Sequence, residues 1–253
     1  MCLIVFAWRH REDYPLIVAA NRDEFYDRPT LAADFWDDCP DVLGGRDLKE
    51  KGTWLGVTRQ GRFAALTNYR DPQNIRPDAP SRGWLVRDYL LGAESAPDYL
   101  AKLEKEGAHY NGFSLVAGDG EGLYYYSNRG GGPVSLPPGV YGLSNHLLDT
   151  PWPKVRRARE RFRRIVATGK NRPRIEALFA VLADGHRPGD EELPDTGIGM
   201  EWERLLASIF IVSPIYGTRS STVLIRDNNN RMLFVERQFN NGSEPWMTAR
   251  VTL

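Results

Sequence analysis

The chain has 253 residues, of which 42% are apolar and 11% aromatic, enough to build the core of one large α/β or α+β domain or of two small ones. Lysine plus arginine and aspartate plus glutamate number 33 each, so net charge gives no signal for a nucleic-acid or acidic-membrane partner. The two cysteines argue against a secreted disulfide framework, and no apolar run approaches the roughly 20 residues of a spanning helix, so we expect a cytoplasmic protein without stable membrane insertion.

The first half of the chain is predicted to form paired strands, because short apolar runs alternate with polar or glycine-containing turns. The expected pairs are residues 3–8 with 16–20, 53–58 with 62–68, and 113–117 with 123–127. Between the second and third pairs, apolar residues at 84, 85, 89 and 90 share one face of a helix. Ser95 is expected to cap a second helix with Pro97 and Asp98 in its first turn.

The second half is predicted to hold two helices followed by strands. Segment 150–153 opens a basic helix whose inward positions are 155, 158, 162 and 165, and residues 174–183 repeat this spacing. Strands are expected at 209–212, 222–226 and 232–237. Hairpins without strict strand–helix alternation indicate antiparallel sheets covered by helices, an α+β fold. With no internal repeat and no clear linker, residues 1–253 are expected to form a single domain.

The second residue is the strongest candidate for chemistry. Methionine is normally removed when the next residue is as small as cysteine, so we expect Cys2 to become the first residue, with a thiol and a free α-amine. The amine titrates at about pH 8 and the thiol at about pH 8.5, so either group can hold the proton that the other loses, without a histidine. The alternative is that a small second residue occurs here by chance.

Four polar residues at 21–24 end the second predicted strand. Alternation along a strand places Asn21 and Asp23 on one face and Arg22 on the other. If the first two strands are neighbours, Cys2 at the head of one lies near the tail of the other. Asp23 would then accept a hydrogen bond from the α-amine or the thiol. The alternative is that these are solvated turn residues.

Two asparagines follow strands of small residues. Asn68 comes just before Tyr69, and Asn145 comes just before the basic helix. A side-chain amide in such a place can donate to a developing oxyanion, which is worth about 3–4 kcal/mol in a transition state. The alternatives are a turn at Asn68 and a cap of the following helix at Asn145.

Arg219 lies in the polar stretch 216–222, where Gly217 lets the backbone approach other groups closely. We expect the Arg219 guanidinium to lower the pKa of the thiol or to hold a carboxylate; the alternative is an ordinary arginine at the entry to a strand. His146 is expected either to line the pocket or to have a capping or surface role. The four histidines show no metal-ligand spacing.

Two other features have simple alternatives. Cys39-Pro40 resembles a thiolate haem-binding dipeptide, although such a pair is common by chance. The arginines between 156 and 164 would suit acidic lipid, nucleic acid or a carboxylate ligand, but a solvated helix face is the interpretation that we prefer.

Together these segments resemble the NRDE family, also called the transport and Golgi organisation 2 family. The naming motif is the Asn-Arg-Asp-Glu run at 21–24, followed here by Phe25 and by Arg28-Pro29. The segments 44–47, 52–56, 64–70, 142–145 and 217–222 are also similar to that family. The resemblance covers essentially the whole chain.

More distantly, the chain is similar to the N-terminal nucleophile cysteine hydrolases: penicillin V acylases, bile-salt hydrolases and acid ceramidase-like amidases. This resemblance implies a four-layer αββα sandwich with two antiparallel sheets. It also implies roles for the site residues. Cys2 would attack an amide, and Asp23 would contact the amine. Asn68 and Asn145 would bind the oxyanion and amine region, and Arg219 would complete the site.

One departure from those amidases concerns the acidity of the thiol. They place an arginine before the asparagine of the motif, where this chain has Ala20. Arg22 is expected to point away from the face shared by Asn21 and Asp23, so it would not replace that arginine. The departure implies a less acidic thiol and slow or absent hydrolysis.

The leading functional hypothesis is hydrolysis of the C–N bond of a small acyl-amide by Cys2, with no metal and no organic cofactor. Asn21, Arg22, Tyr69 and His146 are expected to bind the substrate. In the competing hypothesis, the same fold binds a lipid, acyl or haem-like ligand without reacting it. The expected partner is therefore a small-molecule amide or an amphipathic ligand, and not a nucleic acid.

Overall fold

The computed structural model describes residues 2–167 and 172–253, so Met1, whose removal the sequence predicts, lies outside the described residues. The described strands form two antiparallel sheets, which confirms the predicted α+β class. The chain divides into two compact units, the first from 1–27, 137–144 and 148–253 and the second from 28–136 and 145–147. Because the second unit is inserted into the first, neither is a continuous segment. A single domain over 1–253 stays a prediction.

The first unit is built on a six-stranded sheet in the order β10-β1-β2-β11-β12-β13. Its strands are β1 Cys2–Trp8, β2 Leu16–Phe25, β10 Gly139–Leu143, β11 Tyr216–Arg226, β12 Met232–Phe239 and β13 Pro245–Thr252. The predicted hairpin of the first two strands is confirmed. It places the head of β1 against the tail of β2, because Cys2 pairs with Arg22 and Trp8 pairs with Leu16.

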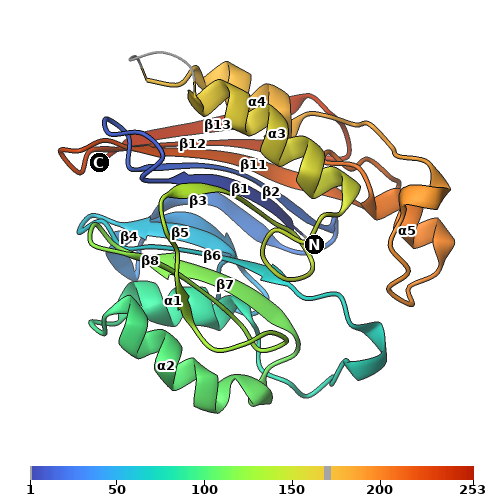
Figure 1. Ribbon diagram of the computed structural model, residues 1–253, viewed down its shortest axis with the longest axis horizontal. Coiled ribbons are helices and arrows are strands. Elements are labelled where there is room, and N and C mark those ends of the chain that lie inside the picture. Colours follow the sequence, from blue (N-terminus) through green and yellow to red (C-terminus); the bar gives the residue numbers. More distant parts are fainter. Residues whose placement is uncertain (1, 168–171) are drawn as a thin grey trace. The chain divides into compact units, whose positions relative to one another are not determined.

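Helices α3 (Pro153–Ala167) and α4 (Ile175–Leu182) cover one face of this sheet (Figure 1). The side chains of alternate strand residues, such as Leu3, Val5 and Val223, pack with the apolar faces of both helices. The residues between them in each strand point to the opposite face. Each position in these strands can therefore be assigned to the helix-covered face or to the opposite face.

The C-terminal part differs from the prediction at three places. A strand at 209–212 is wrong, since this segment makes only an isolated bridge between Val212 and Gly217. Instead, Ile211 packs in a small core with Tyr216 and with helix α5 (Met200–Leu206), which was not predicted. β13 was also missed, because its residues alternate between exposed and partly exposed and carry little apolar signal.

The second unit is a seven-stranded antiparallel meander in which the strands follow one another in chain order. Its strands are β3 Thr30–Trp36, β4 Cys39–Asp47, β5 Leu55–Thr58, β6 Phe63–Asn68, β7 Phe113–Gly118, β8 Leu123–Ser127 and β9 Val134–Ser135. Helices α1 (Gly83–Leu91) and α2 (Ala96–Glu106) pack their apolar residues on this sheet. The predicted cap is confirmed, since Ser95 Oγ accepts a hydrogen bond from the backbone N–H of Asp98.

Strands β3 and β4 were not predicted, and the reason lies in their composition. β4 contains Gly44-Gly45, a pair that usually marks a turn. In the sheet, a Cβ on Gly44 would lie 2.7 Å from the backbone oxygen of Leu55, so the neighbouring strand requires glycine there. In the part of the chain that the structure describes, no helix is both long and apolar enough to cross a bilayer.

Candidate active site

Cys2 and Arg22 form the centre of the candidate site in the first unit. They are direct partners in the antiparallel register of β1 and β2, so their side chains lie on the same face, the one opposite to α3 and α4. Cys2 is partly buried, and Arg22 is only 5% exposed. The Nη2 atom of Arg22 lies 3.9 Å from Oε2 of Glu24, the next residue of β2 on this face. Of the four motif residues, Arg22 and Glu24 therefore share a face with the candidate nucleophile.

The electrostatic surroundings of the thiol act in both directions. Burial raises the pKa of Cys2, and the negative charge of Asp23 adds to the rise. The positive charge of Arg22 and a hydrogen bond from the backbone N–H of Asp23 lower the pKa but do not offset burial. Because the net direction is upward, the thiol is protonated near neutral pH, and a reaction through its sulfur requires a base.

Arg219 does not take the place that the sequence suggested for it. A β-bulge interrupts the pairing of β11 with β2, so that Thr218 is opposite Asp23 and Ser220, not Arg219, is opposite Arg22. The guanidinium of Arg219 donates from Nη1 to the carbonyl oxygens of Phe25 at 2.8 Å and of Tyr26 at 3.2 Å. The arginine whose charge lowers the pKa of Cys2 is thus Arg22.

Asp23 lies on the helix-covered face and is 1% exposed, so it is not a solvated turn residue. Its Oδ1 accepts a hydrogen bond of 2.7 Å from Oγ1 of Thr218. Burial raises the pKa of Asp23, while the positive charge of Lys154 from α3 and the Thr218 hydrogen bond act to lower it. Gly217 permits this arrangement, because a Cβ there would lie 2.6 Å from the carbonyl oxygen of Ile211.

Asn21 is also on the helix-covered face, where its polar atoms have partners within the chain. Its Nδ2 donates to the carbonyl oxygens of Leu182 and Ile209, both at 2.9 Å. Its Oδ1 accepts a hydrogen bond of 2.6 Å from Oγ of Ser221. This side chain ties β2 to the end of α4 and to the segment after α5; a role in substrate binding stays a prediction.

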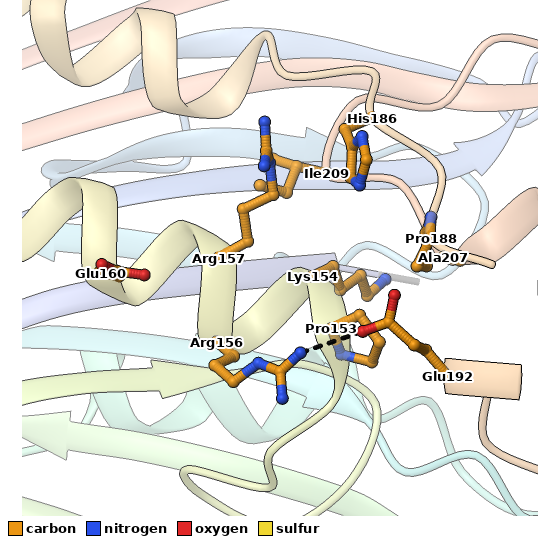
Figure 2. A pocket seen from close by; sticks show the side chains of 10 residues that line it. All are labelled: Pro153, Lys154, Arg156, Arg157, Glu160, His186, Pro188, Glu192, Ala207 and Ile209. Carbon is orange, nitrogen blue, oxygen red and sulfur yellow. Dashed lines mark hydrogen bonds and ion pairs between the residues drawn. The ribbon is translucent and has the colours of Figure 1, made fainter.

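A pocket of about 250 Å³ opens on the helix side of the first unit (Figure 2). Its lining includes Lys154, which is 3% exposed, and Ile209, whose carbonyl receives Asn21. Arg156 in its wall forms an ion pair with Glu192 at 3.1 Å, drawn as a dashed line in Figure 2. The pocket therefore lies on the helix-covered face, where Ile209 contacts Asn21 of the motif. The side chain of Cys2 lies on the opposite face.

The second unit holds the other predicted residues. Asn68 ends β6, and the fully buried Asn145 donates from Nδ2 to the Asn68 carbonyl oxygen at 3.0 Å. The Asn145 carbonyl in turn accepts from the backbone N–H of Arg70 at 2.8 Å. The helix-cap alternative for Asn145 is wrong, because α3 begins only at Pro153. The two asparagines form one hydrogen-bonded group.

Tyr69 and His146, which directly follow Asn68 and Asn145 in the chain, extend this group. The Tyr69 hydroxyl and Nε2 of His146 share a hydrogen bond of 2.6 Å, and the two rings lie 4.6 Å apart. Burial lowers the pKa of His146, and the positive charge of Arg70 adds to this, so the imidazole is neutral at pH 7. Burial likewise raises the pKa of Tyr69. His146 is thus held in a defined hydrogen bond and is neither a cap nor a free surface residue.

Sequence reasoning missed Ser220, Gln238 and Lys154. Ser220 and Gln238 are buried on the same face as Arg22, because they are consecutive partners in the register of β2, β11 and β12. The alternation of polar and apolar residues along β12 could have predicted the face of Gln238. The face of Ser220 could not be predicted in this way, because it depends on the bulge in β11. Among the described residues, no three His, Cys, Asp or Glu side chains are grouped so that they could hold a metal ion.

The fold is similar to that of a solved bile acid hydrolase. A solved structure titled as the C2A mutant of the conjugated bile acid hydrolase from Clostridium perfringens superposes with a TM-score of 0.56, over 99% of this chain and 92% of that chain. The two sequences are only 8% identical, so the likeness concerns the fold.

The chain belongs to the transport and Golgi organisation 2 family, whose sequence model matches residues 1–241. It is 43% identical to the transport and Golgi organization protein 2 homolog of Bos taurus, over 98% of this chain and 97% of the relative. It is 40% identical to the homolog of Homo sapiens, over 94% of this chain and 92% of the relative. The resemblance seen in the motifs is thereby confirmed.

Proposed function

We propose that the protein is an N-terminal cysteine amidohydrolase that cleaves the C–N bond of a small acyl-amide. One observation carries the proposal: Cys2, at the start of β1, is the direct cross-strand partner of the buried Arg22, and the two side chains share one face of the sheet. A cysteine at a strand end beside a buried cation is suited to act as a nucleophile, and this supports the proposal. The similarly folded conjugated bile acid hydrolase, solved as its C2A mutant, supports the reaction class.

The reaction begins with removal of Met1, which frees the α-amine of Cys2. Because burial keeps the thiol protonated, this amine takes the thiol proton while Sγ attacks the amide carbonyl. The tetrahedral intermediate collapses as the ammonium returns its proton to the leaving amine, and a thioester remains on Cys2. Water, deprotonated by the same amine, then releases the acid and restores the thiol.

The remaining residues take supporting roles in this proposal. Asp23, held by Thr218, orients the α-amine, and Arg22 stabilises the thiolate as it forms. For Asn68 and Asn145 the role of oxyanion donors stays a prediction from the resembling amidases. The hydrogen bond between these two asparagines supports a joint function, because it fixes the orientation of the Asn145 amide.

The test compares wild type, Cys2→Ala and Cys39→Ala on a panel of N-acyl amides, with intact-mass measurement of each protein. We expect an acyl adduct on Cys2 and release of amine by wild type, and a loss of roughly 10⁴-fold or more in Cys2→Ala. Cys39→Ala is the matched control, because Cys39 is the only other cysteine and is likewise partly buried. A wild-type protein that has lost Met1 yet neither forms an adduct nor releases amine would refute the proposal.

One observation favours a second candidate, a non-catalytic carrier of a lipid, acyl or haem-like ligand. The pKa of Cys2 is raised, as expected for a thiol that is not activated. A carrier would retain the same ligand in wild type and in Cys2→Ala after purification from cells. Ligand extraction and mass spectrometry of both proteins therefore separate the two candidates.

A further inference from the structure

The face of the first sheet that carries Cys2 also carries a row of polar side chains. Cys2 is opposite Arg22, Arg22 is opposite Ser220, and Ser220 is opposite Gln238 on the adjacent strands β1, β2, β11 and β12. Directly opposite residues point to one face, so these four residues, the polar row, follow one another across the sheet. With strands about 4.8 Å apart, the polar row spans roughly 14 Å.

Ser220 is the member of the polar row whose hydrogen-bonding capacity is unused. It is 1% exposed, and its Oγ has no hydrogen-bond partner among the described residues. The next two hydroxyls of β11 do have partners, since Ser221 binds Asn21 and Thr222 binds Glu236. A buried, unsatisfied hydroxyl is unfavourable, and alanine at this position would avoid the cost. The group that satisfies Ser220 is therefore to be sought in a ligand.

The β-bulge places this hydroxyl in the polar row. In an unbroken register, Thr218 opposite Asp23 would bring Arg219 opposite Arg22, with two positive charges face to face. The extra residue moves Arg219 toward the carbonyl oxygens that follow β2 and leaves a neutral donor beside Arg22. Arg22 thus presents only charged donors to this space, and Ser220 presents a hydroxyl that can donate as well as accept.

Charge is distributed unevenly along the row and its neighbours. Arg22 lies at the end that holds Cys2, whereas the buried carboxylate of Glu236 lies beside the far end. Glu236 accepts hydrogen bonds from Nε2 of Gln238 at 2.6 Å and from Oγ1 of Thr222 at 3.2 Å. Glu24 lies on the same face, 3.9 Å from Nη2 of Arg22. A negative group on a ligand is therefore favoured between Arg22 and Ser220 and disfavoured next to Glu24 and next to Glu236.

We infer that Arg22 and Ser220 bind a carboxylate of the substrate beside the scissile amide. This inference rests on the proposed hydrolase function and specifies its substrate class: acyl-amides whose carboxylate lies a few bonds from the amide nitrogen, as in N-acyl amino acids. Arg22 donates charge-assisted hydrogen bonds to the carboxylate, and Ser220 donates one from Oγ. Ser220 is a binding residue that sets specificity and does not take part in proton transfer.

The test uses two probes that differ only in charge, N-phenylacetylglycine and N-phenylacetylglycinamide. Calorimetric binding to Cys2→Ala removes turnover from the measurement. We expect the carboxylate probe to bind at least tenfold more tightly than the carboxamide probe, and Ser220→Ala on this background to reduce the preference about tenfold. Equal binding of the two probes, binding of neither, or an unchanged preference in Ser220→Ala would overturn the inference.

Stability provides a readout that a merely structural role would not reproduce. Ser220→Ala removes an unsatisfied hydroxyl, so its melting temperature is expected to equal or exceed that of its parent. Thr222→Val is the matched control on the same strand and face; it breaks a bond to Glu236 and is expected to lower the melting temperature while leaving the probe preference unchanged. A lower melting temperature in Ser220→Ala would also count against the inference.

The two proposals can fail separately. Turnover of both probes by the wild-type protein, followed by release of glycine or glycinamide, tests the hydrolase function alone. If neither is cleaved but the Cys2→Ala protein binds the carboxylate probe selectively, the anion site stands and the hydrolase function fails. If both are cleaved at equal kcat/KM and bound equally, the hydrolase function stands and the anion site fails.

Discussion

The two sheets differ in the charges that they bury. Among the described residues, the first unit buries six charged side chains and the second buries one, Arg70. The six in the first unit are Arg22, Asp23, Lys154, Glu203, Arg226 and Glu236. Burial of a charge is costly unless the charge is well paired, and sheets that serve only as scaffolds avoid it. Four of these six side chains lie on strands of the first sheet, the sheet that also holds Cys2.

The second sheet shows how a scaffold of the same class is built. All six residues of β7 are buried, and Phe113, Leu115 and Ala117 on this strand pack in one cluster with α1 and α2. The buried polar residues of its strands are serines and threonines, of which Ser114 and Ser127 donate to the backbone oxygens of His146 and Phe113. The polar groups of the second unit that suit chemistry lie at the strand end Asn68 and in the segment 145–147. These polar groups therefore lie at or beyond the end of a strand and not within the packed sheet.

The largest effect is expected from a substitution that removes apolar packing from the second sheet. Leu115 is fully buried in the cluster with α1 and α2, so Leu115→Ala is expected to lower the free energy of unfolding by about 2–5 kcal/mol. Urea denaturation followed by circular dichroism measures the change. The reactivity of Cys2 in the folded protein should not change, because this substitution alters no charge near the thiol.

Leu31→Ala is the matched control for this prediction. Leu31 lies on β3 of the same sheet but is 54% exposed, so its loss should change the free energy of unfolding by less than about 0.5 kcal/mol. Similar losses for both variants would mean that the second sheet is not stabilised by the packing described.

The next largest effect concerns the charges around the thiol. Because the positive charge of Arg22 lowers the pKa of Cys2, Arg22→Gln is expected to raise that pKa and to slow alkylation by iodoacetamide at pH 7 about tenfold. A Cys39→Ala background leaves Cys2 as the only thiol. The rate as a function of pH, followed by intact mass, gives the pKa directly.

Asp23→Asn is expected to shift the pKa of Cys2 in the opposite direction. The charge of Asp23 raises the pKa of Cys2, so its removal should lower that pKa and speed alkylation at pH 7, while the backbone donor at this position remains. If both substitutions shift the rate in the same direction, the thiol responds to general disruption and not to the two charges.

The hairpins of β1 with β2 and of β7 with β8 could be predicted from the sequence because their apolar runs and turn residues are local signals. The motif residues could likewise be placed at a strand end. Local patterns did not reveal β4, in which Gly44 is required by the close approach of Leu55 from the next strand. They also did not reveal β13, whose residues are largely exposed.

Within the candidate site, the sequence placed Cys2 and the two faces of the motif correctly, since these follow from strand alternation. It could not place Arg219, because a single bulge changes which residue faces Arg22. Nor could it indicate that Asn145 would bind the Asn68 carbonyl, since the partners are 77 positions apart and neither asparagine has a local pattern that requires the other. Long-range register and bulges are tertiary properties that local patterns do not encode.

The smallest expected effect concerns charges that the first unit keeps near its surface. Five of the six arginines of α3 form ion pairs within the chain, and Asp184 binds two of them, Arg157 at 2.6 Å and Arg161. Partial burial acts to raise the pKa of Asp184, but the hydrogen bond and charge of Arg157 outweigh it, so this pKa lies below its ordinary value of 3.8. Asp184→Asn is therefore expected to cost about 1 kcal/mol of unfolding free energy at pH 7.

The pH dependence of this loss follows from the sign of the shift. A carboxyl whose pKa is lowered in the folded state contributes stability above its unfolded pKa and loses that contribution as pH falls through the folded pKa. Wild type and Asp184→Asn should thus differ at pH 7 and converge below pH 3.8 in urea denaturation. Asp190→Asn is the matched control, because Asp190 pairs with Arg204 at a fully exposed site, where no measurable change is expected. If the difference in unfolding free energy between wild type and Asp184→Asn persisted at low pH, Asp184 would stabilise the fold through its shape and backbone contacts. Its ion pairs with Arg157 and Arg161 would then not be the cause.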